Sequence, residues 1–189
     1  MSIFAIASKI DYGLLADAIT HYGNFGWQQV EVPWIASYEA LNATYFDDHF
    51  ATGAPGWGLV GSAEQGFIEL AARDLIEPGR YMAVSPCFRN EQRWTRDHQP
   101  WFIKLELWDT ERDSYHDTMQ EALEVMSELA PSKKIIPWQI GDTHDIVSEE
   151  DYRVPLELGS YGRRKARVYG REIEWNYGTG IALPRFSQM

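Results

Sequence analysis

The stretch from Gly79 to Trp108, GRYMAVSPCFRNEQRWTRDHQPWFIKLELW, predicts two strands joined by a charged loop. The first strand is expected over Arg80–Phe88 and the second over Trp101–Trp108. In the second strand polar or aromatic side chains alternate with aliphatic ones, a period typical of an antiparallel strand that is half buried. One face of this strand carries Phe102, Lys104 and Glu106. Because that face lies opposite an arginine-rich strand end, the hairpin forms either the floor of a site for a flat anionic ligand or a solvated surface.

The composition indicates one folded domain over residues 1–189. With 44% hydrophobic and 14% aromatic residues the chain can bury a sizeable core, and it lacks the composition of a disordered protein. Its 17 basic and 28 acidic residues give a net charge of −11, so nucleic-acid binding would need a local basic patch. The single cysteine, Cys87, excludes an internal disulfide and leaves no CxxC pair for zinc, and it is expected to be a small buried hydrophobe.

No apolar run approaches the ~20 residues that span a membrane, and the first residues, MSIFAIASKIDYG, lack the features of a secretory signal. We therefore expect a cytoplasmic protein without membrane contact.

The remaining helices and strands follow from hydrophobic periodicity. Helices are predicted over Asp11–Tyr22, Gln65–Leu75 and Tyr115–Leu129, and strands over Gln28–Ile35, Lys134–Ile140, Pro155–Gly159, Ala166–Tyr169 and Glu172–Tyr177. Residues Gly141–Asp145 are expected to form a turn, and Gly178–Arg185 a glycine-rich turn that leads into a helix. Prominent hairpins without a βαβ repeat predict an α+β fold, with a mainly antiparallel sheet flanked by helices.

Two further segments leave alternatives open. Residues 37–58 are aromatic and too long for a tight connection, so they form either a flap over a site or a peripheral excursion. Within them His49, Asp47 and Asp48 could bind a metal, although a solvated loop is the favoured interpretation. The basic residues of 163–171 could contact the acceptor end of a nucleic acid, but a solvated hairpin loop is favoured because the chain is acidic overall.

Three separated segments resemble, in order, the motifs of the class II aminoacyl-tRNA synthetase catalytic core. Asp11–Ile35 resembles the first motif, a helix followed by a strand that ends at an interface proline, here Pro33. The central hairpin resembles the second motif: FRNE at 88–91 stands for the FRxE signature, and residues 98–106 match the loop and return strand. The sequence GTGIALPR at 178–185 resembles the third motif and is closest to the seryl-type form of that motif.

Two shorter segments add to this resemblance. The sequence GSAE at 61–64 resembles the TxE loop of the family, with serine in place of threonine. The sequence LELGS at 156–160 resembles the strand that supplies a metal-binding glutamate and a substrate-contacting serine. These segments, which occur in the right order over nearly the whole chain, imply the class II catalytic fold.

The resemblance also implies a site. Its ATP-binding residues would be Arg89, Glu91, His98, Phe102, Gly178, Gly180 and Arg185. Arg89 and Arg185 would be the catalytic residues, with the planar fork of Arg89 bridging the amino acid carboxylate and the α-phosphate. The substrate-binding residues would be Glu64, Glu106 and Ser160, with both carboxylates facing the substrate ammonium. Glu157 would hold Mg²⁺ together with phosphate oxygens.

The function implied is an ATP-dependent ligase that activates an amino acid as its aminoacyl-adenylate. The acceptor would be tRNA, a carrier protein or another non-tRNA acceptor, and the Asp11–Ile35 unit would form a homodimer. The chain departs from the usual family pattern because we expect no anticodon-binding domain. A non-catalytic amino acid- or nucleotide-binding paralogue with a regulatory role is the alternative.

Overall fold

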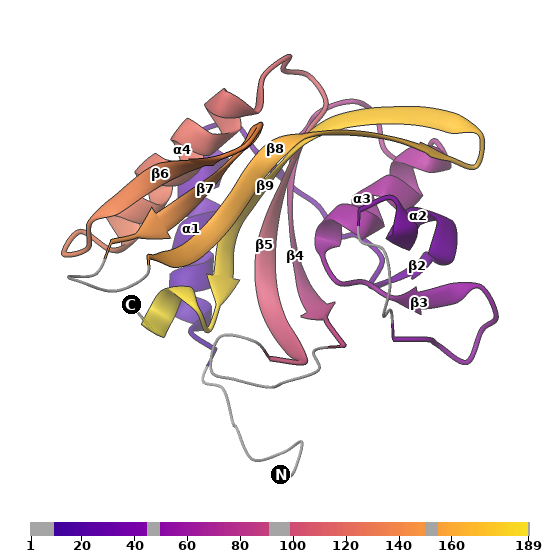
Figure 1. Cartoon of the computed structure of the whole chain (residues 1–189), viewed down its shortest axis with the longest axis horizontal. Helices are drawn as coiled ribbons and strands as arrows, with labels where there is room; N and C mark the ends of the chain where they lie inside the picture. Colours follow the sequence, from indigo (N-terminus) through magenta and orange to yellow (C-terminus); the bar gives the residue numbers. More distant parts are fainter. Residues whose placement is uncertain (1–9, 45–49, 91–98, 150–154, 189) are drawn as a thin grey trace, which may run out of the picture.

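A seven-stranded sheet in the order β1-β4-β5-β9-β8-β7-β6 forms the centre of the computed structural model (Figure 1). The structure describes residues 10–44, 50–90, 99–149 and 155–188. Strand β1 runs parallel to β4, and every other neighbouring pair in this sheet is antiparallel. The strands of this sheet are β1 (Gln28–Gln29), β4 (Arg80–Phe88), β5 (Trp101–Asp109), β6 (Ile135–Ile140), β7 (Thr143–Ser148), β8 (Leu156–Val168) and β9 (Arg171–Leu183).

Helices cover both faces of this sheet. The described helices are α1 (Tyr12–Asn24), α2 (Tyr38–Asn42), α3 (Ala63–Ala72), α4 (Tyr115–Leu129) and the 3₁₀ turn η1 (Phe186–Gln188). A second, two-stranded sheet pairs β2 (Ile35–Ser37) with β3 (Trp57–Leu59). In Figure 1, α1 and α4 lie on one side, and α2 and α3 lie with the small sheet on the other, beneath the long β8–β9 hairpin. The α+β fold with a mainly antiparallel sheet is thus confirmed. Within the described ranges, no helix is both long and apolar enough to span a membrane.

The central hairpin and the last long helix occur where periodicity predicts them. Strand β4 has the predicted bounds, β5 extends by one residue to Asp109, and α4 has the predicted bounds. Helix α1 begins after the predicted N-cap, because the Asp11 carboxylate accepts a hydrogen bond from the Leu14 amide.

The predicted strand over Gln28–Ile35 is wrong, because two different sheets share these residues. The chain pairs with β4 only at Gln28 and Gln29, and it joins the small sheet from Ile35 onward. Between them Pro33 has no N–H to donate to a ladder. Gly66 of α3 packs against this connection so closely that a β-carbon would lie 2.7 Å from the Pro33 carbonyl oxygen.

The predicted glycine-rich turn at Gly178–Arg185 is also wrong, because β9 continues through these residues to Leu183. The glycines serve close packing rather than a turn. A β-carbon on Gly178 would lie 2.8 Å from the Tyr161 ring, and one on Gly180 would lie 3.0 Å from Leu105. After the strand the chain forms only the short turn η1 in place of the predicted helix.

Strand β7 was not predicted from the sequence, and β8 is longer than predicted. The predicted turn over Gly141–Asp145 is confined to its first two residues, and β7 begins at Thr143. The predicted strands over 155–159 and 166–169 are parts of one strand, β8, so the basic residues 163–165 lie in a strand and not in a hairpin loop. The hairpin turn instead lies at Tyr169 and Gly170, which have φ angles of 51° and 76°.

Strand β5 divides the interior into two cores. Leu105 and Leu107 point toward α1 and α4, in a core that also holds Tyr22 and Met126. Trp108 points the other way, toward α3, where it stacks between Phe67 (centroids 5.3 Å apart) and Trp175 (5.1 Å). The face of β5 that carries Trp108 also carries the predicted polar site residues.

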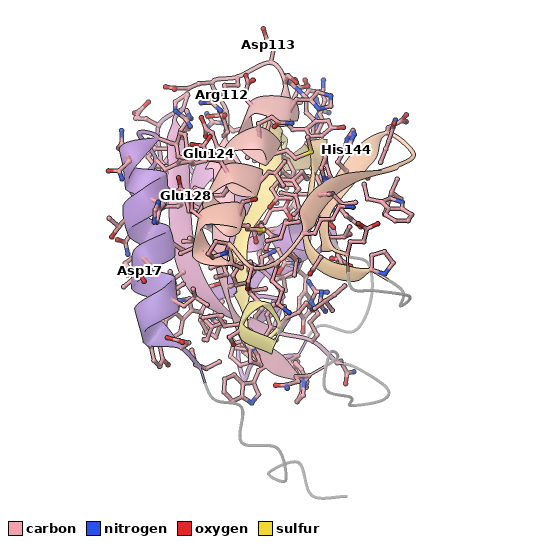
Figure 2. All side chains as sticks on the ribbon, turned by 90° about the vertical axis from the view of Figure 1, so that its left-hand side faces the viewer. Asp17, Arg112, Asp113, Glu124, Glu128 and His144 are labelled. Atoms are coloured by element: carbon pink, nitrogen blue, oxygen red, sulfur yellow. The ribbon has the colours of Figure 1, made fainter. Side chains whose placement is uncertain are left out.

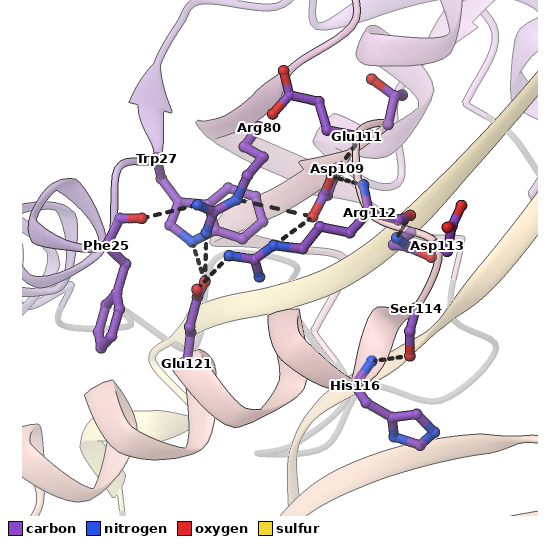
Figure 3. A network of polar contacts seen from close by, with 12 residues as sticks. Phe25, Trp27, Arg80, Asp109, Glu111, Arg112, Asp113, Ser114, His116 and Glu121 are labelled. Atoms are coloured by element: carbon purple, nitrogen blue, oxygen red, sulfur yellow. Dashed lines mark hydrogen bonds and ion pairs between the residues drawn. The ribbon is translucent and has the colours of Figure 1, made fainter.

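A network of buried charges joins the sheet to α4 at one end of β5 (Figure 3). Glu121 of α4 accepts hydrogen bonds from Arg80 (2.6 Å), Arg112 (2.6 Å) and the Trp27 indole (2.7 Å). Both guanidinium groups also lie within 4 Å of the fully buried Asp109 carboxylate, at 3.9 and 3.6 Å. Glu121 therefore balances two arginines that have little access to water.

We expect Glu121→Gln to lower the free energy of unfolding by about 2–4 kcal/mol, because it leaves two partly buried guanidinium groups with one carboxylate. Urea unfolding followed by tryptophan fluorescence measures the change. The matched control is Glu124→Gln on the exposed side of α4 (Figure 2), where the change should be below about 0.5 kcal/mol. Equal losses in the two variants would contradict this account.

Candidate functional site

A cavity of about 350 Å³ lies on the α3 side of the sheet. Strand β5 contributes its predicted polar face to the wall, through Phe102, Lys104 and Glu106. The other walls come mainly from the end of β4, the start of α3, strands β8 and β9, and the residues that follow β9. Of the predicted site residues, the cavity brings together Glu64, Arg89, Phe102, Glu106, Glu157, Ser160 and Arg185.

Four other predicted site residues are not placed in this cavity. Gly178 and Gly180 are absent from its lining, because they pack inward against Tyr161 and Leu105. Glu91 and His98 lie outside the described residues. The metal candidates Asp47, Asp48 and His49 also lie outside them.

Glu64 lies at the inner end of the cavity, in the first turn of α3. Ser62 caps this helix by accepting a hydrogen bond from the Glu64 amide, which places the glutamate side chain at the strand–helix junction. Arg164 Nη1 donates to both carboxylate oxygens, at 2.8 and 2.6 Å. The Trp175 indole donates to Oε1 at 2.7 Å. Glu64 therefore accepts three hydrogen bonds from the protein itself before any ligand is present.

Glu106 lies beside it and is also buried. Its Oε2 atom lies 2.5 Å from the Lys104 ammonium and accepts a hydrogen bond from the Ser62 hydroxyl. Burial raises the pKa of Glu106; the Lys104 charge opposes this rise and the Glu64 charge adds to it. Because desolvation dominates, a further cation near Glu106 would stabilise its charged form.

The opposite end of the cavity holds groups suited to a nucleotide. The Arg89 guanidinium lies over the Phe102 ring, with Cζ 5.3 Å from the centroid. Arg185 Nη1 lies 3.8 Å from the Glu157 carboxylate, whose side chain is half exposed. The part of the chain that the structure describes contains no cluster of three metal-ligating side chains. Glu157 alone still fits Mg²⁺, which one or two carboxylates hold together with substrate phosphates.

Ser160 lines the cavity between these two ends, and its partner is a residue that sequence reasoning missed. The Ser160 hydroxyl donates to Asp145 at 2.6 Å and lies 3.5 Å from Glu157 Oε1. Asp145 lies directly opposite Ser160 in the β7–β8 register. Burial raises the pKa of the Asp145 carboxyl. The sequence assigned Asp145 to a turn, so no local signal pointed to this contact.

Arg164 is the second residue that was missed, because the basic cluster was expected to be solvated. Along β8, Arg163, Lys165 and Arg167 are exposed, whereas Arg164 points to the other face. Its guanidinium lies over the Tyr177 ring, 4.0 Å from the centroid. If residues 163–165 are assigned to a strand, its period of two places Arg164 on the opposite face from Arg163 and Lys165. A strand assignment would therefore have pointed to Arg164.

Comparisons with known proteins agree with this architecture. The chain is similar to the serine–tRNA ligase of Alcanivorax borkumensis, with 31% identity over 138 residues that cover 64% of this chain and 32% of that protein. It is also similar to the serine–tRNA ligase of Rhodopseudomonas palustris, with 26% identity over 169 residues. The chain thus spans about a third of the length of the curated relatives that it matches. No family model matches it.

Solved structures show the same fold. The seryl-tRNA synthetase of Pyrococcus horikoshii complexed with ATP superposes with a TM-score of 0.71 at 18% identity, covering 94% of this chain and 49% of that one. The pyrrolysyl-tRNA synthetase of Desulfitobacterium hafniense gives a TM-score of 0.65 at 17% identity, covering 94% and 68%. The chain therefore has the fold of a class II aminoacyl-tRNA synthetase catalytic core. The serine–tRNA ligases named above are similar to this chain in sequence, at 31% and 26% identity over the matched residues.

Cys87 is expected to be unreactive in the folded protein. Its side chain is fully buried, and burial raises the pKa of the thiol to about 11. Since the thiolate is the nucleophile, we expect no labelling by a thiol-reactive disulfide reagent at pH 8 until a denaturant is added. Fast stoichiometric labelling of the native protein would contradict this expectation, and the denatured sample controls for reagent quality.

Proposed function

We propose that the protein is an ATP-dependent ligase that activates an amino acid as its aminoacyl-adenylate. One observation carries the proposal: a single cavity joins the Arg89–Phe102 and Glu157–Arg185 groups at one end to Glu64 and Glu106 at the other. The first end suits a nucleotide and the second suits a small zwitterion. The serine–tRNA ligase relatives and the class II fold support the same reaction class.

The residues at the ATP end would act by orienting ATP and by offsetting the negative charge of its phosphates. The adenine would stack on Phe102, with the Arg185 guanidinium on its other face. Glu91 would accept from the adenine amino group, and His98 would contact the outer phosphates. Glu157 would hold Mg²⁺, whose charge would offset the negative charge of the ATP phosphates. Gly178 and Gly180 would act indirectly, by letting β9 pack closely against Tyr161 and Leu105 beside the site.

In the proposed reaction a carboxylate oxygen of the amino acid attacks the α-phosphorus of ATP. The bond from the α-phosphorus to the bridging oxygen breaks, and pyrophosphate leaves with the electron pair. Arg89 would hold both the attacking carboxylate and the α-phosphate through its planar fork. Such chemistry depends mainly on orientation and on stabilising charge, which two arginines and one Mg²⁺ can provide.

The amino acid would bind at the inner end. Glu106 would accept the α-ammonium group, a role that fits its buried carboxylate with raised pKa. Glu64 would act beside it as a fixed negative charge, and Ser160 would limit the pocket from the β8 side. The acceptor of the acyl group would be tRNA or a carrier protein.

Replacing Arg89 tests the adenylation step. We expect Arg89→Lys to reduce amino-acid-dependent exchange of pyrophosphate into ATP by about 100-fold, because lysine cannot bridge two oxyanions with a planar fork. The matched control is Arg167→Lys, an exposed arginine of β8 whose replacement should leave exchange unchanged.

The same assay decides between the two candidate functions. Exchange by the folded wild-type protein with at least one of the twenty amino acids supports a ligase. Calorimetric binding of ATP and an amino acid, without exchange, would instead support the binding paralogue. The absence of both exchange and ATP binding would contradict both functions.

We also propose a homodimer through the Asp11–Ile35 unit. Three large apolar side chains of this unit are exposed, namely Tyr12 (68%), Trp34 (50%) and Ile35 (44%). We expect Trp34→Glu to halve the molar mass measured by light scattering, because a buried charge would oppose association. The matched control is Trp138→Glu at the β6 edge, equally exposed at 48%, which should not change the mass. A wild-type monomer would overturn this proposal.

A further inference from the structure

The inner end of the cavity contains two cations that the proposed reaction does not use, Lys104 and Arg164. We propose that Arg164 is a specificity-determining residue, and that the protein activates an amino acid with a short acidic side chain. This inference rests on the proposed function, because it names the substrate class of the same site.

The first step concerns hydrogen bonds. Glu64 already accepts two hydrogen bonds from Arg164 and one from Trp175. Both bonds from Arg164 come from Nη1 alone. Among the described residues, Nε and Nη2 of this guanidinium make no hydrogen bond, and the side chain, which is 35% exposed, lines the cavity. These donors form one edge of a planar fork that fits a carboxylate.

The second step concerns orientation. The Arg164 guanidinium lies over the Tyr177 ring at 4.0 Å, and its bonds to Glu64 hold the other edge. The free edge is therefore held in place before a ligand binds, which reduces the conformational entropy lost on binding. Glu64 acts here as the counter-ion that holds Arg164, rather than as an acceptor for the ligand.

The third step concerns charge. Glu64 and Glu106 balance Lys104 and Arg164, so these four groups have no net charge. An amino acid with a neutral side chain would add one ammonium and leave an unbalanced positive charge at buried groups. An acidic amino acid would add both an ammonium and a carboxylate, which keeps the balance at zero.

These three steps give one binding arrangement. The reacting carboxylate lies at Arg89, the ammonium lies at Glu106, and the side-chain carboxylate takes the free edge of Arg164. A carboxylic acid without an ammonium group would also preserve the charge balance. It would, however, leave both Glu106 and the free Arg164 donors without a ligand partner.

The test compares isosteric pairs in the wild-type protein: aspartate against asparagine, and glutamate against glutamine. We expect pyrophosphate exchange to favour the better acidic member over its amide by at least about tenfold, because the amide lacks the charge that Arg164 pairs with. Binding of aspartyl- and asparaginyl-sulfamoyl adenosine, two unreactive adenylate analogues, measures the same preference without turnover.

Variants then assign the preference to Arg164. Arg164→Met should reduce the ratio of acid to amide by about tenfold or more, and Arg164→Lys should retain part of it. The matched control Arg167→Met, on the exposed face of the same strand, should leave the ratio unchanged. If Arg164→Met does not fold, the wild-type comparison still decides the substrate class.

The outcomes separate this inference from the proposed function. Exchange with serine, alanine or a hydroxy acid in preference to both acidic amino acids overturns the inference and leaves a ligase. A preference for the acid that persists in Arg164→Met overturns the role of Arg164. Absence of exchange with every acid overturns the ligase, while the two sulfamoyl analogues still report whether the pocket prefers the acid.

Discussion

The ion pair between Glu64 and Arg164 is the contact on which the site depends. It joins the start of α3 to the β8–β9 hairpin, two elements that are 100 residues apart in the chain. The indole of Trp175 completes the contact from β9, and the stack of Trp175, Trp108 and Phe67 fills the space behind it. Because a charged pair at a partly buried position requires good geometry to be stable, this contact also sets how the hairpin lies over α3.

The second constraint is that β5 serves both faces of the sheet. Leu105 and Leu107 hold α1 and α4, while Lys104 and Glu106 point into the cavity. A shift of one residue in this strand would exchange the two sets, so the apolar core also fixes the position of the polar site. The Glu121 network at the end of β5 adds a polar anchor between the sheet and α4 (Figure 3). In Figure 2, α1 and α4 cover one face of the sheet. Asp17 lies on the outer surface of α1, and Glu124 and Glu128 lie on that of α4.

The cavity has a different charge arrangement at each end. At the end that holds Arg89 and Arg185, two guanidinium groups outnumber the one half-exposed carboxylate of Glu157, so these groups carry a net positive charge. At the inner end, each carboxylate already has a cation as partner, which makes the pocket neutral and therefore sensitive to the net charge of a ligand. The first arrangement supports the proposed adenylate chemistry, and the second supports the proposed selection of an acidic substrate.

The fold class, the hairpin β4–β5, helix α4 and seven of the residues that line the cavity could be predicted from the sequence. These features depend on local periodicity or on short motifs, so nearby residues are sufficient to indicate them. The partners of those residues depend on contacts between distant segments, which only the folded chain brings together. Asp145 reaches Ser160 through strand register, and Arg164 reaches Glu64 through the path of a long hairpin. The glycines at 178 and 180 looked like a turn because glycine signals flexibility, yet here they allow close packing that only their neighbours in space explain. Pairings between distant segments depend on the whole fold, and a single sequence holds no local signal for them.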